Sequence, residues 1–513
     1  MYRTNQLAMT AQAVQEGEHV AVIGLEIHVQ LETDTKIFCG CSTNQDDPEP
    51  NTYTCPVCLG LPGALPVLNE AAVEFAVKVG KAIDADIPEE TRFHRKNYFY
   101  PDLPKGFQIT QYDAPICQDG KLEFRHKGET RTVGIHRAHL EEDPGSLRHV
   151  RDGSGNIDTR TTGIDRADYT LVNYNRAGTP LMEIVTDPDF RKPGEAVTFL
   201  EKLEEVLEYL GIFDSTRDGS LRVDANLSLV PGEDVDGDGT ISDEVLADAN
   251  RTEVKNISSH KGAESALAYE ESRQRNLIRR GKAVEQETRH FNETHGSTVS
   301  MRSKEEEKDY RYFAEADLPP LQVSDWKERL EIPELPDARR ERFRDEYDLS
   351  KEAASKLTSS KQVADFYEEV AEEFDPDLAA AWVADSLLGE LNYRDMEITD
   401  VEDRLGEFKT LIRLVAEDEI TAKNAEETVL REMLDEGDDP ETVIDREGLG
   451  KADSGEVEQA VEEAIEENPD TVEDYHAGEG GAINFLVGQV MQKTGGSADP
   501  GSVNGMLREQ LDE

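Results

Sequence analysis

Four of the five cysteines lie in one short window of the chain, as Cys39-x-Cys41 followed after thirteen residues by Cys55-x-x-Cys58. Two close pairs of thiolates supply the tetrahedral set of soft ligands that zinc prefers. Because protein would fill all four coordination positions, the pattern predicts a structural zinc site, of a kind that adds about 10–16 kcal/mol of local folding free energy in zinc-finger peptides. The alternative is a group of reduced thiols without metal. Cys117 stands alone, and we expect it to pack as a small hydrophobic side chain.

Carboxylates and one histidine form a second candidate site. Glu26 and His28 share a face of an alternating segment, Glu141 and Glu142 stand together in HLEEDPG, and Glu183 interrupts the apolar run LMEIV. An oxygen-rich set with one imidazole suits Mg²⁺ or Mn²⁺. In so acidic a chain, glutamates on strands also mark solvated faces, so the spacing alone leaves both interpretations open.

The third candidate site is a dense basic and aromatic stretch, RFHRKNYFYPDLPKGFQ at 92–108. It contains Arg92, Arg95, Lys96, Tyr98, Phe99, Tyr100 and Lys105. Composition leaves two interpretations open, a structural aromatic cluster with partly buried basic side chains or a seat for an anion or nucleotide. No G-x-x-x-x-G-K-[ST] loop and no G-x-G-x-x-G after a strand occurs, so any ATP chemistry needs a different scaffold. The sequence also lacks a G-x-S-x-G elbow and a Gly/Ser-rich amidase signature.

Alternating hydrophobicity predicts the strands that would carry these groups. Candidate strands are 19–32, 132–143, 181–186, 220–230 and 251–258. A helix is predicted at 193–211, between Pro193 and Gly211. Because strands dominate the first half and helices follow from about residue 309, we expect an α+β fold rather than a doubly wound parallel sheet.

The same pattern divides the chain into four parts. We expect a loose N-terminal extension at 1–17, a catalytic cradle with the cysteine knuckle at 18–308, a helical domain at 309–437 and a small helical tail domain at 438–513. Two stretches, 151–165 and 231–248, look like insertions. The second matches the start of an EF-hand loop, but Val245 stands where the bidentate glutamate is needed, so we expect an acidic surface hairpin there.

The charge balance is extreme, with 110 acidic against 55 basic residues and a formal net charge of -55 in 513 residues. The acidity is spread along the chain, which is typical of proteins from cells with molar internal salt, where charge repulsion is screened. A surface that holds a basic partner would more often concentrate the charge in a block. No apolar run is long enough for a membrane helix and no secretion signal is evident, so we expect a cytoplasmic protein.

Long strings in register then resemble the B subunit of the aspartyl/glutamyl-tRNA amidotransferases. They are IGLEIHVQL, RKNYFYPDLPKGFQITQYD, IHRAHLEEDPG, YNRAGTPLMEIVTDPD, GSLRVDANLSL, TEVKNI, MRSKEEEKDYRYF and INFLVGQVMQ. The resemblance runs from about residue 20 to the end. It implies a β-sheet cradle similar to the glutamine synthetase catalytic fold. It also implies that ATP and Mg²⁺ phosphorylate the side chain of Asp mischarged on tRNA-Asn, or of Glu on tRNA-Gln. Ammonia from a separate amidase (A) subunit then displaces the phosphate, within a heterotrimer that includes a small C subunit.

The resemblance also implies roles for particular residues. It assigns Mg²⁺ to His28, Glu142 and Glu183, with Glu26 beside them, and places Lys96 on the ammonia path. It implies nucleotide or acceptor-end contacts for Arg222, Asp224, Asn226, Lys255 and Asn256. The four cysteines match the zinc-bearing members, in which zinc is a brace, and the YqeY-like tail at 438–513 is similar to a tRNA-binding domain.

Two rival functions remain at this stage. One is the related archaeal subunit specific for Glu-tRNA(Gln), which usually carries a large insertion between the cradle and the helical domain. Here the segment that starts MRSKEEEKDYRYF runs on through a short connection into DARRERFRDEYDL, so we favour the three-subunit enzyme. The other is a zinc-containing tRNA-binding subunit without catalysis. The sequence does not say whether Asp or Glu is the physiological target.

Overall fold

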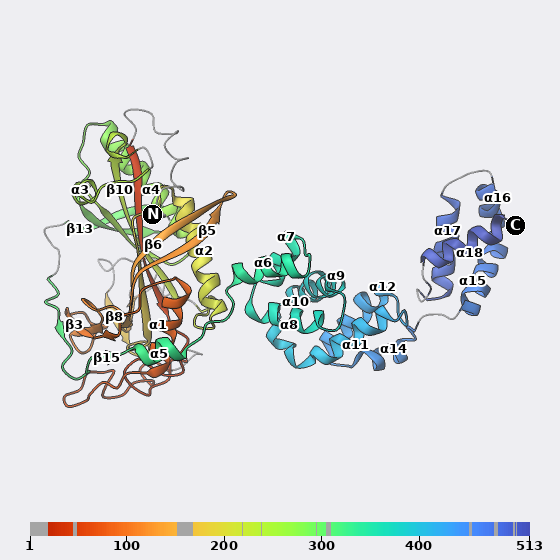
Figure 1. The fold of residues 1–513 in the computed structure, drawn as a ribbon, viewed down its shortest axis with the longest axis horizontal. Coiled ribbons are helices and arrows are strands. Elements are labelled where there is room, and N and C mark those ends of the chain that lie inside the picture. The colour runs from red at the N-terminus through yellow and green to blue at the C-terminus, as the bar shows by residue number, and fades with distance from the viewer. Residues whose placement is uncertain are drawn as a thin grey trace. The chain divides into compact units, whose positions relative to one another are not determined.

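The protein is described by a computed structural model that covers residues 19–44, 49–150, 168–217, 219–236, 239–293, 295–303, 309–450, 454–476, 481–495, 498 and 500–512. The expected N-terminal extension and the insertion at 151–165 lie outside these residues. The chain divides into two compact units, the first ending at Leu335 and the second beginning at Pro336 (Figure 1).

One large mixed sheet organises the first unit. Among the described residues it has eleven strands, in the spatial order β13-β12-β11-β10-β1-β9-β6-β4-β3-β14, with β5 paired to β6. The strands are β1 (His19–Gln30), β3 (His94–Asn97), β4 (Phe107–Thr110), β5 (Cys117–His126), β6 (Glu129–Glu142), β9 (Pro180–Thr186), β10 (Leu221–Pro231), β11 (Thr252–Ile257), β12 (Glu287–Asn292), β13 (Ser297–Ser303) and β14 (Phe313–Ala314). Only β11 and β12 pair in parallel among these described strands. Two small pairs, β2 (Glu90–Thr91) with β15 (Leu321–Gln322) and β7 (Ser146–Val150) with β8 (Tyr169–Asn173), lie outside this sheet.

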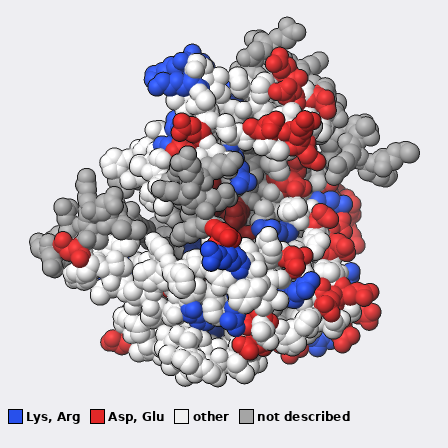
Figure 2. Space-filling view, turned by 90° about the vertical axis from the view of Figure 1, so that its left-hand side faces the viewer, with Lys and Arg blue, Asp and Glu red and all other residues white. Residues whose placement is uncertain are grey.

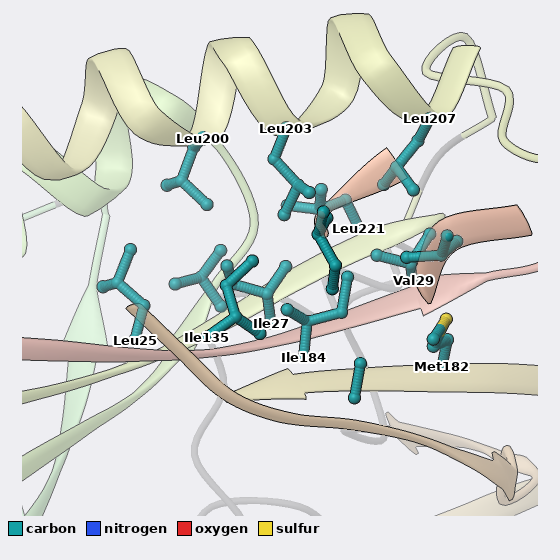
Figure 3. Close-up of a cluster of buried hydrophobic side chains, with 14 of the residues drawn as sticks. Leu25, Ile27, Val29, Ile135, Met182, Ile184, Leu200, Leu203, Leu207 and Leu221 are labelled. Carbon is teal, nitrogen blue, oxygen red and sulfur yellow. The ribbon is translucent and has the colours of Figure 1, made fainter. Parts of the chain in front are cut away.

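Helices cover the apolar face of the sheet. They are α1 (Glu70–Ala82), α2 (Pro193–Tyr209) and α4 (His260–Arg279), and a single hydrophobic core joins them to the strands. Figure 3 shows leucines of α2 lying over Leu25 and Ile27 of β1 and Ile184 of β9. Because side chains alternate along a strand, burying these residues turns their neighbours Glu26, His28 and Glu183 to the opposite face. The sheet therefore has one apolar and one polar face.

Smaller elements complete the first unit. They are the 3-10 turn η3 (Gly232–Asp234) and the helices α3 (Asp243–Asp248) and α5 (Ser324–Arg329). A bridge joins Val235 to Ile241 in the described part of the acidic stretch, for which we expected a surface hairpin. The segment from 309 to Leu335, which we expected to open the helical domain, packs against the first core through Trp326, Leu330 and Leu335.

The second unit is helical. Its described residues form two hydrophobic cores, one from side chains of 343–443 and one from side chains of 457–511. Its α-helices are α6 (Pro336–Glu346), α7 (Lys351–Leu357), α8 (Lys361–Ala371), α9 (Pro376–Ala380), α10 (Leu388–Tyr393), α11 (Leu405–Ala416), α12 (Ala422–Asn424), α13 (Leu430–Glu436), α14 (Pro440–Glu447), α15 (Ser454–Glu467), α16 (Pro469–His476), α17 (Ala482–Lys493) and α18 (Pro500–Asp512). The π-helical turns η5 (Ala381–Leu387) and η8 (Ala425–Val429) and the 3-10 turns η6 (Ile398–Asp400) and η7 (Glu402–Arg404) connect them.

The sheet and the helices confirm the expected α+β class, with a helical C-terminal region. In the part of the chain that the structure describes, none of the helices combines the length and the apolar character needed to span a membrane. On the face seen in Figure 2, lysine and arginine side chains lie scattered among acidic ones rather than in one basic patch.

Candidate functional site: a carboxylate–histidine row and a four-cysteine cluster

The register of three central strands builds a row of polar side chains. His28 of β1 lies opposite Glu183 of β9, and Glu183 lies opposite His139 of β6. Nε2 of His28 is 3.5 Å from Oε2 of Glu183 and 3.9 Å from Oε1 of Glu141, and Nε2 of His139 is 3.8 Å from Oε2 of Glu183. Two overlapping groups therefore have ligand atoms within 4.8 Å of one another, Glu26–His28–Glu183 and His139–Glu141–Glu183.

The carboxylates of these two groups carry more negative charge than the histidines of the same groups can balance. Burial and the neighbouring Glu183 raise the pKa of Glu26, and the same two causes raise the pKa of Glu141 to about 7. Burial alone would lower the pKa of His28, but its hydrogen bond with Glu183 and the surrounding carboxylates raise it to about 9. Burial lowers the pKa of His139 to about 4, which leaves that imidazole neutral. Carboxylates that repel one another beside the neutral imidazole of His139 are a fitting site for a hard divalent cation, whose own charge would also favour the loss of the proton from His28.

A second set of charged residues flanks this row. Arg222 lies opposite His28 in the register of β10 and β1, and its Nη2 is 2.7 Å from Oδ1 of Asp143. Asp143 is buried, and Gln30 donates to its other oxygen at 2.8 Å. Burial would raise the pKa of Asp143, but Arg222 and Arg176 hold it below its usual range. Asp143 thus fixes the Arg222 guanidinium beside the carboxylate–histidine row, the cluster formed by Glu26, His28, His139, Glu141 and Glu183.

The remaining polar residues of β10 and β11 continue the same face. Asp224 lies opposite Glu26 and is 2.5 Å from Nζ of Lys255, which is also 2.8 Å from Glu253. Asn256 has a left-handed backbone with φ of 66° and contacts Nδ1 of His290 at 2.7 Å. All five residues that the sequence proposes for nucleotide or acceptor-end contacts therefore lie on two adjacent strands, and two of them, Arg222 and Asp224, lie opposite His28 and Glu26 of the cluster.

Several polar atoms of this face have no partner within the protein. In the described part of the chain, Nδ1 of His139, Nε of Arg222 and Oδ1 of Asn226 are buried without a hydrogen bond. Buried polar atoms are rarely left unpaired unless a ligand or water completes them. Unpaired donors and an acceptor around carboxylates fit a site for a polar, phosphate-bearing ligand with a divalent cation.

The basic and aromatic stretch borders the site through Lys96 of β3. Burial would lower the pKa of Lys96, but Glu141, Glu183 and nearby tyrosines raise it well above its usual range. Its Nζ lies 5.1 Å from the centroid of the Tyr310 ring. Arg95 points elsewhere, to Glu315 at 2.6 Å, and the Phe99 side chain is exposed. Lys96 of this stretch thus lies beside the cluster, whereas Arg95 pairs with Glu315.

The four cysteines predicted to bind zinc converge in space. The Sγ atoms of Cys39, Cys41, Cys55 and Cys58 lie within 4.8 Å of one another, and none of them forms a disulfide. The hydrogen bond from Cys39 lowers the pKa of Cys58 to about 4, and burial together with the hydrogen bond to Cys55 raises the pKa of Cys41 to about 11. Cys117 is buried in the main core, as expected. Four converging thiols fit a tetrahedral soft metal ion such as Zn²⁺.

Two family models match most of the chain. One, described as the GatB/GatE catalytic domain, matches residues 21–328, and one described as the GatB domain matches 365–511. A protein of Haloarcula marismortui is 77% identical over 504 residues, covering 98% of this chain and 100% of that protein. Proteins of Natronomonas pharaonis and Methanospirillum hungatei are 72% and 53% identical, covering 98% and 96% of this chain and 100% and 98% of their own lengths. All three are named as the B subunit of aspartyl/glutamyl-tRNA(Asn/Gln) amidotransferase.

The chain belongs to the family of amidotransferase B subunits. The resemblance seen in the sequence is thereby confirmed. Haloarcula marismortui and Natronomonas pharaonis are halophilic archaea, in agreement with the origin expected from the distributed acidic charge.

In this member of the family, the structure brings together most of the residues that the sequence proposes for the metal. His28, Glu183 and Glu26 converge, whereas the side chain of Glu142 turns the other way. Both carboxylate oxygens of Glu142 lie 2.5 Å from Nζ of Lys105, and one accepts a hydrogen bond from the backbone N–H of Ile109 at 2.8 Å. Neighbouring residues on a strand face opposite sides, so Glu141 and Glu142 cannot both point at Glu183 from a regular strand.

Sequence reasoning missed two members of the site, His139 and Asp143. It had proposed the pair Glu141 and Glu142, and the resemblance chose Glu142, whereas Glu141 is the one that joins the cluster. The alternation of β6 was a usable signal, because it places His139 and Glu141 on one face of that strand. For Asp143 there was no such signal, since its importance comes from Arg222 and Gln30 on other strands.

Proposed function

We propose that this chain is the B subunit of an aspartyl/glutamyl-tRNA(Asn/Gln) amidotransferase and converts the side-chain carboxylate of a mischarged aminoacyl-tRNA into an amide. The observation that carries the proposal is the 77% identity over 98% of the chain to a protein of that name, with the carboxylate–histidine row lying inside the matched catalytic domain. The relatives are named as subunits, which supports a complex, and we propose an amidase (A) subunit and a small C subunit as partners.

The chemistry requires an activated carboxylate. A carboxylate is a poor electrophile, and phosphorylation by ATP gives it a leaving group that ammonia displaces, so we propose an acyl phosphate as the intermediate. Glu26, His28 and Glu183, with Glu141 beside them, would hold Mg²⁺, which neutralises phosphoryl charge when bound. Glu142, which the resemblance also implies as a ligand, joins this set only if its side chain leaves Lys105.

The chain's own residues would bind and orient the reactants. Arg222, held by Asp143, presents its unpaired Nε toward an anionic oxygen, and Asn226 offers an unpaired acceptor. We propose that these residues, with Asp224, Lys255 and Asn256, contact ATP or the acceptor end of tRNA. Lys96 would line the path of ammonia, because Glu141 and Glu183 of the site raise its pKa and its Nζ lies 5.1 Å from the centroid of the Tyr310 ring.

Further parts of the proposal concern the rest of the chain. The four cysteines would bind Zn²⁺ as a brace, and the small helical tail beyond residue 438 would contact the body of tRNA. The polar face of the mixed sheet supports a cradle of the glutamine synthetase kind. Molar salt weakens backbone-phosphate binding, so tRNA recognition would depend on shape and specific contacts.

An amidation assay tests the proposal. The chain would be reconstituted with the A and C subunits in high KCl and supplied with ATP, Mg²⁺ and glutamine, together with Asp-tRNA(Asn) or Glu-tRNA(Gln) in separate reactions. We expect amide formation and ATP turnover with at least one substrate. Amidation of only one of the two substrates would identify the physiological target, and binding of tRNA without ATP turnover would favour a non-catalytic tRNA-binding role.

A further inference from the structure

Lys36 is a fully buried lysine that lies beside the four-cysteine cluster. It follows β1, and no part of its side chain reaches solvent. A buried ammonium is strongly unfavourable unless an anion accompanies it and its hydrogen-bond donors are satisfied. Lys36 is not part of the carboxylate–histidine row on the polar face, so the burial of Lys36 needs a separate explanation.

The three donors of the ammonium have three acceptors. Nζ donates to the carbonyl oxygen of Tyr53 at 2.7 Å, to the carbonyl oxygen of Tyr174 at 3.3 Å and to Sγ of Cys58 at 3.7 Å. In the parts of the chain that the structure covers, no carboxylate forms an ion pair with Lys36. Because carbonyl groups are neutral, the sulfur of Cys58 is the partner that can balance the charge.

The backbone around Lys36 is held in place on both sides. Its N–H donates to the carbonyl oxygen of Cys41 at 2.9 Å, and the N–H of Ile37 donates to the carbonyl oxygen of Gly178 at 2.9 Å. Gly178 has a left-handed φ of 87°, and a Cβ there would lie 3.5 Å from Cδ of Lys36 and 3.6 Å from Cβ of Cys58. Lys36 is therefore fixed between the cysteine loops and the turn that leads into β9.

We propose that the Lys36 ammonium is the charge partner of a zinc–tetrathiolate centre formed by Cys39, Cys41, Cys55 and Cys58, and that it links this centre to the turn before β9. The inference rests on the proposed zinc site and deepens it. Four thiolates around Zn²⁺ form a dianionic centre, and a buried cation offsets part of that charge. The N–H···S bond also withdraws electron density from Cys58, so its thiolate holds the metal while reacting less readily with electrophiles.

The full-length chain and its Lys36→Met variant test this proposal by metal titration. Methionine keeps much of the length and volume of lysine but removes the charge and the donors. Zn²⁺ affinity would be measured by competition with a chromophoric chelator, and Co²⁺ would report the sulfur-to-metal charge-transfer band. We expect Lys36→Met to weaken Zn²⁺ binding about 10- to 100-fold, the range for removing an outer partner of a metal ligand. We also expect the charge-transfer band of the Co²⁺ form to move to longer wavelength, because a thiolate that accepts no hydrogen bond has lone-pair electrons of higher energy.

Two further variants separate charge from packing. Lys36→Arg keeps the cation and should retain more affinity than Lys36→Met, while Lys36→Gln keeps a neutral donor and should fall between them. If Lys36→Met does not fold, Lys36→Gln and Lys36→Arg carry the comparison. Lys327→Met is the control for loss of a lysine donor elsewhere, because the exposed Lys327 donates to the carbonyl oxygen of Ile87 at 3.0 Å and is not a neighbour of the thiols. It should leave both metal readouts unchanged.

The outcomes distinguish this inference from the zinc proposal. If the wild-type chain takes up neither Zn²⁺ nor Co²⁺, the zinc site is refuted and the role of Lys36 with it. If wild type binds both metals, but the neutral Lys36 variants keep the same affinity and the same charge-transfer band, the zinc site stands and the role of Lys36 is overturned.

Discussion

Replacing Glu183 by glutamine should weaken Mg²⁺ binding and lower amide formation together. Glu183 belongs to both overlapping ligand groups and is buried. Two unit charges 4 Å apart interact by about 4 kcal/mol at an effective dielectric constant of 20. Desolvation and the remaining ligands reduce that figure, so we take about 3 kcal/mol, the upper value for a hydrogen bond to a charged group. At about 1.4 kcal/mol for each factor of ten, Mg²⁺ affinity should fall by about 100-fold or more.

Calorimetric titration of Mg²⁺ in high KCl measures this loss directly. Mg²⁺-dependent ATP turnover of the reconstituted complex should fall in parallel, while the complex still assembles and hydrolyses glutamine. Glu270→Gln is the matched control, because Glu270 is also fully buried but pairs with Arg273 at 2.6 Å, away from the row. That variant should lose stability and keep its Mg²⁺ affinity. Unchanged Mg²⁺ affinity and amide formation in Glu183→Gln would refute the proposed metal site.

Three further predictions concern neighbouring groups. Glu142→Gln leaves the largely buried Lys105 ammonium without its carboxylate, so the free energy of unfolding without Mg²⁺ should fall by about 3–5 kcal/mol. Denaturant unfolding measures this free energy, and adding Lys105→Met to Glu142→Gln should restore most of the lost stability. An unchanged unfolding midpoint in Glu142→Gln would show that the Lys105–Glu142 ion pair does not stabilise the protein. Asn226→Ala should raise the KM for ATP roughly fivefold without changing stability, because one hydrogen bond to ligand is worth about 1 kcal/mol; an unchanged KM would exclude that contact. Cys58→Ser should lower both the zinc content by elemental analysis and the melting temperature, and a metal-free wild-type protein would rule out the brace.

Much of the fold was readable from the sequence because local patterns were strong. The alternation around Glu26 and His28 predicts a strand at 19–32, and β1 spans His19–Gln30. The apolar stripe after Pro193 predicts a helix at 193–211, and α2 spans Pro193–Tyr209. Strand order was not readable in this way, because β1 pairs with β9 and β10, which follow it by about 150 residues or more.

The site was only partly readable for the same reason. Alternation assigns Glu26 and His28 to one face, but which carboxylate of the adjacent pair Glu141 and Glu142 meets them depends on the register between β6 and β9. The burial of Lys36 carries no sequence signal at all, because it depends on backbone carbonyls from residues 17 and 138 positions away.

The sequence by itself determined the family, the α+β class, the cysteine set and the polar face of each central strand. These features follow from residue types and short-range spacing, which the chain carries before it folds. Only the tertiary structure decided that His28, Glu183 and His139 form one row, that Glu142 pairs with Lys105, and that Lys36 is buried against Cys58. Those contacts arise from strand register and loop packing across long sequence separations, where no local pattern specifies the partner.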